Sequence, residues 1–280
     1  MVKKKEWIPK IGFNRDVDNE TYHANKTHVS SSVLKTVLKS LDDYRKQYIE
    51  GEPAFFGNQN ALDFGSYLHA LILEPHVIQD EFCFFKGDNK AGEEFVEFFK
   101  ANKDSGKIII TNTMKNQAKE LLENFYNTKV RNHKGEDVLI NEFVIGGHAE
   151  ETLCVEMDGI KVKVRFDYRK ITECGYASIN DVKTTSSKIK TKKDVEKVCK
   201  MWGYDLSAAL YCDAVEQFTG IKHDFYFIFI SKDDKGTTLW KASEQMLESG
   251  RKKYKIALAK LKKARETGLY QEGTVEIDSI

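Results

Sequence analysis

Apolar and charged residues alternate without interruption along Ile160-Lys161-Val162-Lys163-Val164-Arg165-Phe166-Asp167-Tyr168-Arg169. A period of two is typical of a strand with one buried face. Asp158-Gly159, directly before it, predicts a tight hairpin turn from an earlier strand. Glu173-Cys174-Gly175 predicts a second turn, which leads into a further strand over residues 176–183. The centre of the chain is therefore predicted to be an antiparallel sheet.

Outside this centre, apolar residues recur at the spacing of helices. The serines at positions 30–32 precede one such run and predict its N-terminal cap, whereas Pro75 ends another. A purely apolar strand is expected over residues 225–230. The expected helices lie near residues 30–50, 61–74, 91–103, 112–128, 205–218 and 242–266.

This order of helices and strands predicts an α/β (α+β) fold with a central mixed β-sheet flanked by helices. No composition shift or internal repeat marks a domain boundary in the 280 residues, so we expect a single domain. Residues 1–28 are expected to be irregular, and residues 29–135 to form a mainly helical part. Residues 136–280 are expected to form the β-rich catalytic core and its closing helices.

Composition and charge exclude several classes of protein. The net charge is only +1, which neither indicates nor excludes a nucleic-acid partner. The five cysteines form no C-x-x-C pair, which argues against a zinc or iron–sulfur site. No apolar run approaches the roughly 18–20 residues of a membrane helix, and the basic N-terminus lacks the apolar segment of a signal peptide. We therefore expect a cytoplasmic protein with no membrane partner.

The two central strands place carboxylates opposite each other. If their turn is centred on Cys174, Asp167 lies opposite Asp181. By the same count Arg165 lies opposite Lys183, which follows Asp181 by two residues and so shares its face. Opposed residues have Cβ atoms roughly 4.5–5.5 Å apart, so the two carboxylates repel each other unless a cation lies between them. The pair therefore predicts a metal site.

This arrangement suits the hydrolysis of a phosphodiester. Mg²⁺ prefers hard oxygen ligands, which the carboxylates and the backbone carbonyl of Val182 would supply. The ion polarises the phosphate and activates water, and Lys183 would position that water or stabilise the charge that develops in the transition state. An Asp-x-Lys triplet is weak evidence by itself, because charges on a strand are more often ordinary surface residues. The surrounding motifs decide between these two interpretations.

The sequence Val164-Arg165-Phe166-Asp167, followed by Ile179-Asn180-Asp181-Val182-Lys183-Thr184-Thr185, resembles the D…DxKTT core of PD-(D/E)xK nucleases. The likeness is to the exonuclease VIII (RecE-type) and lambda-exonuclease group of phage recombination nucleases. Residues 64–75 resemble the G-x-x-x-H helix of this group, with Gly65 and His69 at the motif positions. Residues 29–35 resemble its first helix, and the motifs follow the family's order over roughly residues 28–260.

The resemblance implies a restriction-endonuclease-like core and assigns roles to particular residues. It implies that His69 binds metal, although a lone helical histidine is more often packed. Glu150 matches the acidic position before the aspartate strand, but strand periodicity does not choose between Glu150 and Glu151. Ser30 and Ser32 would contact DNA phosphate or simply cap their helix. The expected catalytic residues are Asp167, Asp181, Lys183 and Glu150; the metal ligands are His69, Asp167, Asp181 and Val182; and the DNA-binding residues are Ser30, Ser32, Arg165, Thr184 and Tyr211.

The activity that the resemblance implies is Mg²⁺-dependent digestion of linear double-stranded DNA, 5′→3′, to leave single-stranded overhangs for recombination. Mn²⁺ is expected to substitute for Mg²⁺. The implied partners are DNA ends, further copies of the chain in a ring and a single-strand annealing protein, in the cytoplasm of a bacterial host cell. Ser207 departs from the glutamine of RecB-like relatives, whereas Tyr211 keeps their tyrosine. The alternatives are an endonuclease or nickase on the same core, or a non-catalytic DNA-binding protein.

Overall fold

β7 (Ile160–Ile171) is the strand that the alternating stretch predicts, and it lies between β6 (His148–Met157) and β8 (Ala177–Thr185). The β6–β7 hairpin turns through Asp158 and Gly159, whose φ angles of 51° and 78° lie in the left-handed region. A two-residue turn of this kind matches the twist of the strands that it joins, and Asp-Gly adopts it readily. These elements belong to a computed structural model that describes residues 7–15, 17–53 and 57–271.

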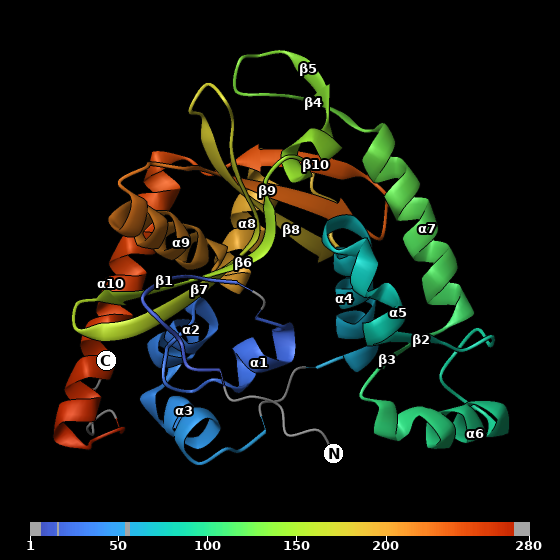
Figure 1. Cartoon of the computed structure of the whole chain (residues 1–280), viewed down its shortest axis with the longest axis horizontal. Helices are drawn as coiled ribbons and strands as arrows, with labels where there is room; N and C mark the ends of the chain where they lie inside the picture. The colour runs from blue at the N-terminus through green and yellow to red at the C-terminus, as the bar shows by residue number, and fades with distance from the viewer. Residues whose placement is uncertain (1–6, 16, 54–56, 272–280) are drawn as a thin grey trace, which may run out of the picture.

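Three further strands complete a six-stranded sheet, which lies at the centre of Figure 1. They are β1 (Gly12–Asn14), β9 (Asp224–Ser231) and β10 (Thr237–Lys241), and the strand order is β1-β6-β7-β8-β9-β10. β8 and β9 run parallel, whereas all other neighbours are antiparallel, so the predicted mixed sheet is confirmed. The parallel pair needs a crossover, which α8 (Lys192–Trp202) and α9 (Tyr204–Thr219) provide.

Helices cover both faces of the sheet (Figure 1). On one face lie α2 (Ser31–Lys39), α9 and α10 (Glu244–Thr267); on the other lie α4 (Gln59–Leu73) and α7 (Asn112–Asn127). Each face has its own apolar core. The first core includes Leu34, Phe166, Leu210, Phe225, Phe227 and Leu258. The second includes Leu68, Leu121, Phe125, Tyr168, Val182 and Ile228.

The remaining elements are short. The helical ones are α1 (Asn19–Ala24), α3 (Leu41–Tyr44), a π-helical turn (Arg45–Ile49), α5 (Ile78–Glu81), α6 (Glu93–Asn102) and 3₁₀ turns at Pro75–Val77, Lys103–Ser105 and Ile140–Val144. The strands form two small pairs, β2 (Phe82–Phe84) with β3 (Ile108–Ile110), and β4 (Lys129–Arg131) with β5 (Asp137–Leu139).

Two sequence expectations differ from the structure in the N-terminal part. The segment 1–28 is not wholly irregular, because β1 pairs with β6 and α1 is capped by the Asp18 carboxylate; residues 1–6 and 16 lie outside the described residues. The helix expected over residues 30–50 is broken at Ser40, whose ψ of 127° is extended and whose hydroxyl caps α3. Serine competes with the helical backbone for hydrogen bonds, and this competition explains the break.

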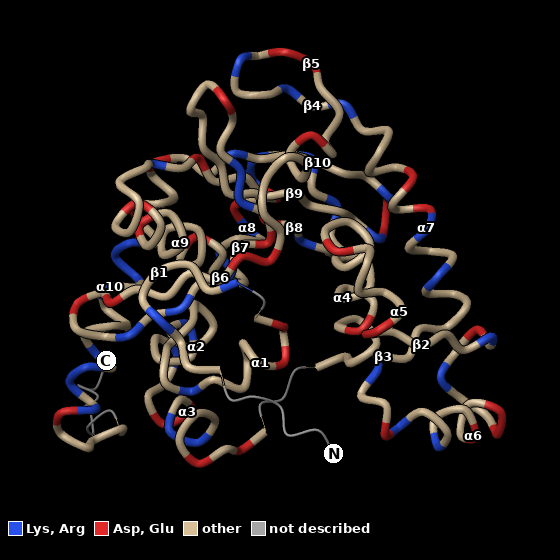
Figure 2. Tube along the Cα trace, viewed as in Figure 1, with Lys and Arg blue, Asp and Glu red and all other residues tan. Residues whose placement is uncertain are grey.

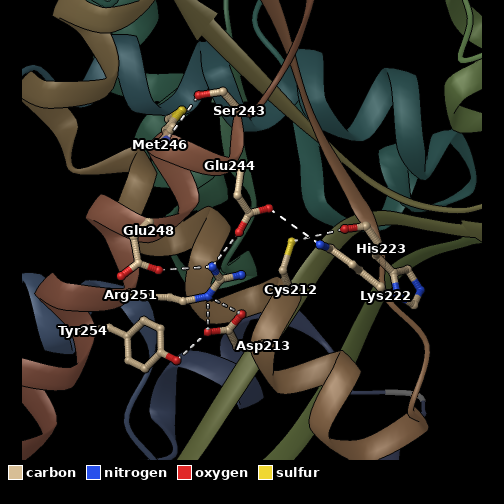
Figure 3. Close-up of polar contacts among 10 residues, drawn as sticks. All are labelled: Cys212, Asp213, Lys222, His223, Ser243, Glu244, Met246, Glu248, Arg251 and Tyr254. Atoms are coloured by element: carbon tan, nitrogen blue, oxygen red, sulfur yellow. Dashed lines mark hydrogen bonds and ion pairs between the residues drawn. The ribbon is translucent and has the colours of Figure 1, made fainter.

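Polar contacts fix α9 against α10, as Figure 3 shows. The Arg251 guanidinium of α10 donates to both carboxylate oxygens of Asp213 on α9 at 3.0 Å, and the Tyr254 hydroxyl donates to the same carboxylate at 2.6 Å. Arg251 also pairs with Glu244 at 2.8 Å. Gly250 allows the two helices to approach, because an added Cβ would lie 2.0 Å from a backbone carbonyl oxygen of α9. α9 is thereby held firmly against the sheet.

All five cysteines are free thiols in the structure. None of the helices in the described part of the chain has the length and apolar character that a bilayer crossing requires.

Candidate active site

A cleft opens between α4, the N-terminal end of α2 and the strands β6, β7 and β8. Its volume of about 1060 Å³ lies at the upper end of the roughly 300–1,000 Å³ that small-molecule pockets have. In Figure 2, acidic and basic stretches lie side by side in this region, where β6, β7 and β8 face α4. The candidate residues that line the cleft are Ser30, Ser32, His69, Glu150, Arg165, Asp167, Val182, Thr184 and Tyr211.

Three potential metal ligands meet on the floor of the cleft. The His69 Nε2 atom lies 3.1 Å from the Asp167 carboxylate, and the His69 Nδ1 atom lies 3.4 Å from the Glu150 carboxylate. One ligand atom from each of the three residues lies within 4.8 Å of the others. An imidazole and two carboxylates form a donor set that suits a divalent cation. Among the described residues, this is the one cluster of at least three such side chains.

Backbone geometry brings Glu150 into this cluster. Glu150 lies across from Asp167, between the ladder pairs Ala149↔Tyr168 and Glu151↔Phe166, and has a φ of 49°. A positive φ is rare for a residue with a side chain and costs on the order of 1–3 kcal/mol, so such positions concentrate at functional sites.

The two candidate glutamates, Glu150 and Glu151, each form an ion pair with a different arginine of β7. Arg165 forms an ion pair with Glu150 and donates to the carbonyl of Val17 at 2.6 Å. Glu151 instead pairs with Arg169 at 2.6 Å. The structure therefore places Glu150, and not Glu151, beside His69. The ion pair with Glu150 and the hydrogen bond to Val17 both occupy the Arg165 guanidinium.

The β7–β8 register is the one that a turn centred on Cys174 predicts, with Tyr168 opposite Asn180 and Arg169 opposite Ile179. The ladder ends there, and the Val182 amide donates to the Asp167 carboxylate at 2.9 Å. The expectation that Arg165 faces Lys183 is wrong. β7 and β8 no longer pair beyond Tyr168, and the partner of Arg165 across the sheet is Thr152 of β6.

Lys183 lies between two of the aspartates. Its ammonium group is 2.6 Å from the Asp181 carboxylate and 3.6 Å from that of Asp167. Burial alone would lower the pKa of Lys183, but the Asp167 and Asp181 carboxylates together raise it above its usual value. Lys183 is therefore charged. Asp181 is only 4% exposed, and its carboxylate contacts this ammonium group instead of joining the cluster around His69.

The same charges perturb the other groups of the site. Burial raises the pKa of Asp181 to about 6, with Asp167 adding to the effect and Lys183 opposing it. Burial lowers the pKa of His69, but the attraction of Asp167 and Glu150 outweighs it and raises that pKa to about 9. Burial likewise opposes ionisation of Asp167, yet Lys183 and His69 hold the pKa of that carboxyl below its usual range. Strong perturbation of several neighbouring groups is typical of an active site, and two of them, His69 and Asp167, line the cleft, whereas Asp181 and Lys183 lie behind them and are not among its lining residues.

The expected DNA-binding residues line the wall above these groups. Ser30 is the N-cap of α2 but makes no side-chain capping bond, and its hydroxyl lies 3.2 Å from that of Ser32. The N-terminal end of α2 therefore faces the cleft with amide groups that favour an anion. Thr184 and Tyr211 line the same space, and the Tyr211 ring packs edge-on against Phe166 with centroids 5.7 Å apart.

Sequence reasoning did not single out several further cleft residues. Tyr204 and Trp202 line the cleft from the junction of α8 and α9, and Lys232 lines it from the loop after β9. The Tyr204 ring lies 5.6 Å from the Lys183 ammonium group. Ser207, which stands where relatives carry glutamine, is half-buried on α9 and is not among the residues that line the cleft. The α8 helix was not expected at all, so no signal pointed to its end.

The mixed sheet flanked by helices, with an Asp-x-Lys strand beside an acidic cluster, defines a protein of the PD-(D/E)xK nuclease superfamily. The chain belongs to a family described as a PDDEXK-like domain of unknown function, whose model matches residues 30–274. No curated protein matches the sequence. The fold is similar to a crystal structure of a protein from Eubacterium rectale, described as "Putative exonuclease". That structure has a TM-score of 0.61 and 18% sequence identity, over 95% of this chain and 97% of the other.

Proposed function

We propose that the protein is a Mg²⁺-dependent exonuclease that digests linear double-stranded DNA, 5′→3′, to leave single-stranded overhangs. The observation that carries this proposal is the His69–Glu150–Asp167 cluster, which lines a large open cleft and has the Lys183 ammonium group 3.6 Å from the Asp167 carboxylate. Family membership supports a nuclease, and the description of the Eubacterium rectale protein supports an exonuclease. The proposal also includes a role in recombination and Mn²⁺ as a substitute metal. It further includes a ring-shaped oligomer, a single-strand annealing partner and a cytoplasmic location.

The donor set fits a divalent cation that prefers oxygen. His69, Glu150 and Asp167 would hold it, whereas Asp181 pairs with Lys183 and the Val182 backbone contacts Asp167 through its amide. When bound, the cation supplies Lewis-acid polarisation of the scissile phosphate and activation of water. Hydrolysis then forms a bond from the water oxygen to phosphorus and breaks the phosphorus–oxygen bond to the leaving nucleotide.

The protein's own groups act on the charge of the phosphate. The Lys183 ammonium group is largely buried and contacts Asp181 and the proposed metal ligand Asp167, so it would stabilise negative charge that develops on a phosphate bound at the metal. The N-terminal end of α2, with Ser30 and Ser32, offers amide and hydroxyl donors to a second phosphate of the strand. Arg165 holds Glu150 in the cluster through their ion pair and acts as a positioning residue.

A cleavage assay with two DNA topologies tests the proposal. Linear duplex and closed circular duplex of the same sequence are incubated with the protein and Mg²⁺, and EDTA removes the metal in the control. We expect loss of the linear DNA only, with mononucleotides as products. Cleavage of the closed circle would favour the endonuclease or nickase alternative, and binding without cleavage of either substrate would favour the non-catalytic one.

A further inference from the structure

Two large apolar side chains lie exposed at the edge of the active-site cleft. Met201 and Trp202 form the C-terminal end of α8, and both line the cleft that contains His69 and Asp167. Met201 is 62% exposed and Trp202 is 60% exposed. Neither residue belongs to the two apolar cores of the described chain. Exposed apolar groups that gather at a cleft indicate a binding surface.

The chain geometry fixes Trp202 relative to the reacting groups. Gly203, with a φ of 60°, ends α8, and α9 begins directly afterwards at Tyr204. The Tyr204 ring stacks on Phe227 of β9 with centroids 6.1 Å apart and lies 5.6 Å from the Lys183 ammonium group. Trp202 is thus two residues from the side chain that contacts Lys183. Whatever stacks on Trp202 therefore lies in the same cleft as His69 and Asp167.

The positive charge on the segment that contains Trp202 favours the binding of a polyanion. Residues 186–202, which comprise the loop after β8 and helix α8, contain six lysines and two acidic residues. Three of these lysines form ion pairs, with Asp233, Asp234 and Glu196. Lys197 and Lys200 are exposed on the same helix as Trp202. An aromatic ring beside a basic segment is the combination with which proteins bind single-stranded nucleic acid, because each base presents a flat face for stacking.

A base inside a duplex is already stacked on its neighbours, so it is not free to stack on a protein ring without the cost of unpairing. We propose that Trp202, supported by Met201, is a stacking platform for an unpaired base next to the scissile phosphate. The strand that enters the cleft is therefore single-stranded, either as a free strand or as the frayed end of a duplex. This inference rests on the proposed nuclease function and narrows its substrate.

Binding measurements in Ca²⁺ test the platform without cleavage. Wild type, Trp202→Ala and Trp202→Phe are titrated with a labelled single-stranded oligonucleotide and with the same oligonucleotide made wholly abasic. Phe99→Ala, which removes a 48% exposed ring from α6, is the matched control. We expect Trp202→Ala to weaken binding of the normal strand about tenfold or more. Trp202→Phe and Phe99→Ala should stay within about threefold of wild type, because phenylalanine still stacks and α6 does not line the cleft.

The abasic strand distinguishes stacking from a general loss of contact. If Trp202 stacks on a base, Trp202→Ala changes binding of the abasic strand by less than about twofold. Equal losses on both strands, or no loss on either, would overturn the inference. So would an unchanged DNA affinity together with a smaller oligomer, because Trp202 would then be a contact between copies of the chain. A wild type that cleaves DNA in Mg²⁺ while Trp202→Ala binds normally overturns this inference alone, whereas a wild type that neither binds nor cleaves DNA overturns the proposed function as well.

Discussion

Replacing Lys183 with methionine should remove catalysis while leaving most DNA binding intact. The Lys183 ammonium group lies 2.6 Å from Asp181 and 3.6 Å from the proposed metal ligand Asp167, and under the proposed function it would contact the phosphate bound there. A contact that strengthens in the transition state lowers the barrier more than it strengthens ground-state binding. Loss of one such electrostatic donor typically costs about 10²–10³ in rate. We therefore expect at least about a hundredfold slower cleavage.

The substitution also affects stability, which must be measured separately. Asp181 is 4% exposed, and without Lys183 it becomes a buried carboxylate that has lost its direct ion pair. Removal of one partner of a buried pair costs about 3–5 kcal/mol, and the cost falls towards the lower end here because 26% of the Lys183 side chain is exposed. Thermal melting with and without Mg²⁺ measures this loss, and Mg²⁺ should recover part of it. Lys119→Met on α7, where the lysine side chain is 78% exposed, is the control and should change neither quantity.

Single-turnover cleavage at saturating enzyme, paired with DNA binding in Ca²⁺, separates chemistry from binding. Lys183→Arg should also be slow, because a planar guanidinium does not reproduce a compact ammonium group. If Lys183→Met binds DNA weakly but cleaves at the normal rate when saturated, Lys183 is only a phosphate anchor. If the variant is fully active, β8 is not the catalytic strand.

Three further predictions concern the metal and the fold. His69→Ala should weaken the apparent Mg²⁺ affinity and slow cleavage strongly, as measured by metal titration; lower thermal stability with an unchanged metal dependence would show that His69 only packs. Arg251→Met should destabilise the protein by about 2–3 kcal/mol in urea unfolding, less than for a fully buried pair, because 20% of the Arg251 side chain is exposed and Tyr254 still donates to Asp213. Gly250→Ala should cost at least about 3 kcal/mol in the same assay, because its Cβ would lie 2.0 Å from a backbone oxygen; wild-type stability would show that α10 shifts freely.

The central strands could be predicted because their sequence pattern is local and regular. The alternation in β7 and the Asp158-Gly159 turn correctly predict the β6–β7 hairpin, and the symmetry about Cys174 predicts the β7–β8 register as far as Tyr168 and Asn180, where the ladder ends. The long helices α4, α7, α9 and α10 follow from apolar periodicity in the same way. In contrast, β1 and β10 are three and five residues long and form only because β6 and β9 offer them an edge. No short window of sequence contains that information.

The candidate site likewise has one part that local sequence pattern predicts and another part that depends on long-range contacts. The sequence places Asp167, Asp181 and Lys183 on adjacent strands, and the structure brings Asp167 and Lys183 within 3.6 Å of each other. It could not choose between Glu150 and Glu151, because the choice depends on a positive φ and on the arginine partner that each glutamate finds across the sheet. The contact of α4 with the strands, which brings a helical histidine to the acids, is likewise a long-range feature of the fold.

The measurement that tests the central claim most directly is product analysis on a linear duplex labelled at one 5′ end, with wild type and Asp167→Ala. Asp167 contacts His69 at 3.1 Å and accepts from Val182 at 2.9 Å, so its carboxylate is central to the cluster. Asp137→Ala, which removes a 70% exposed carboxylate from β5, is the control. We predict that wild type and Asp137→Ala release the 5′ label as a mononucleotide only when Mg²⁺ is present, whereas Asp167→Ala leaves the duplex intact and stays folded. Cleavage by Asp167→Ala at a near-normal rate, or release of the label by wild type in EDTA, would contradict a metal-dependent nuclease at this site.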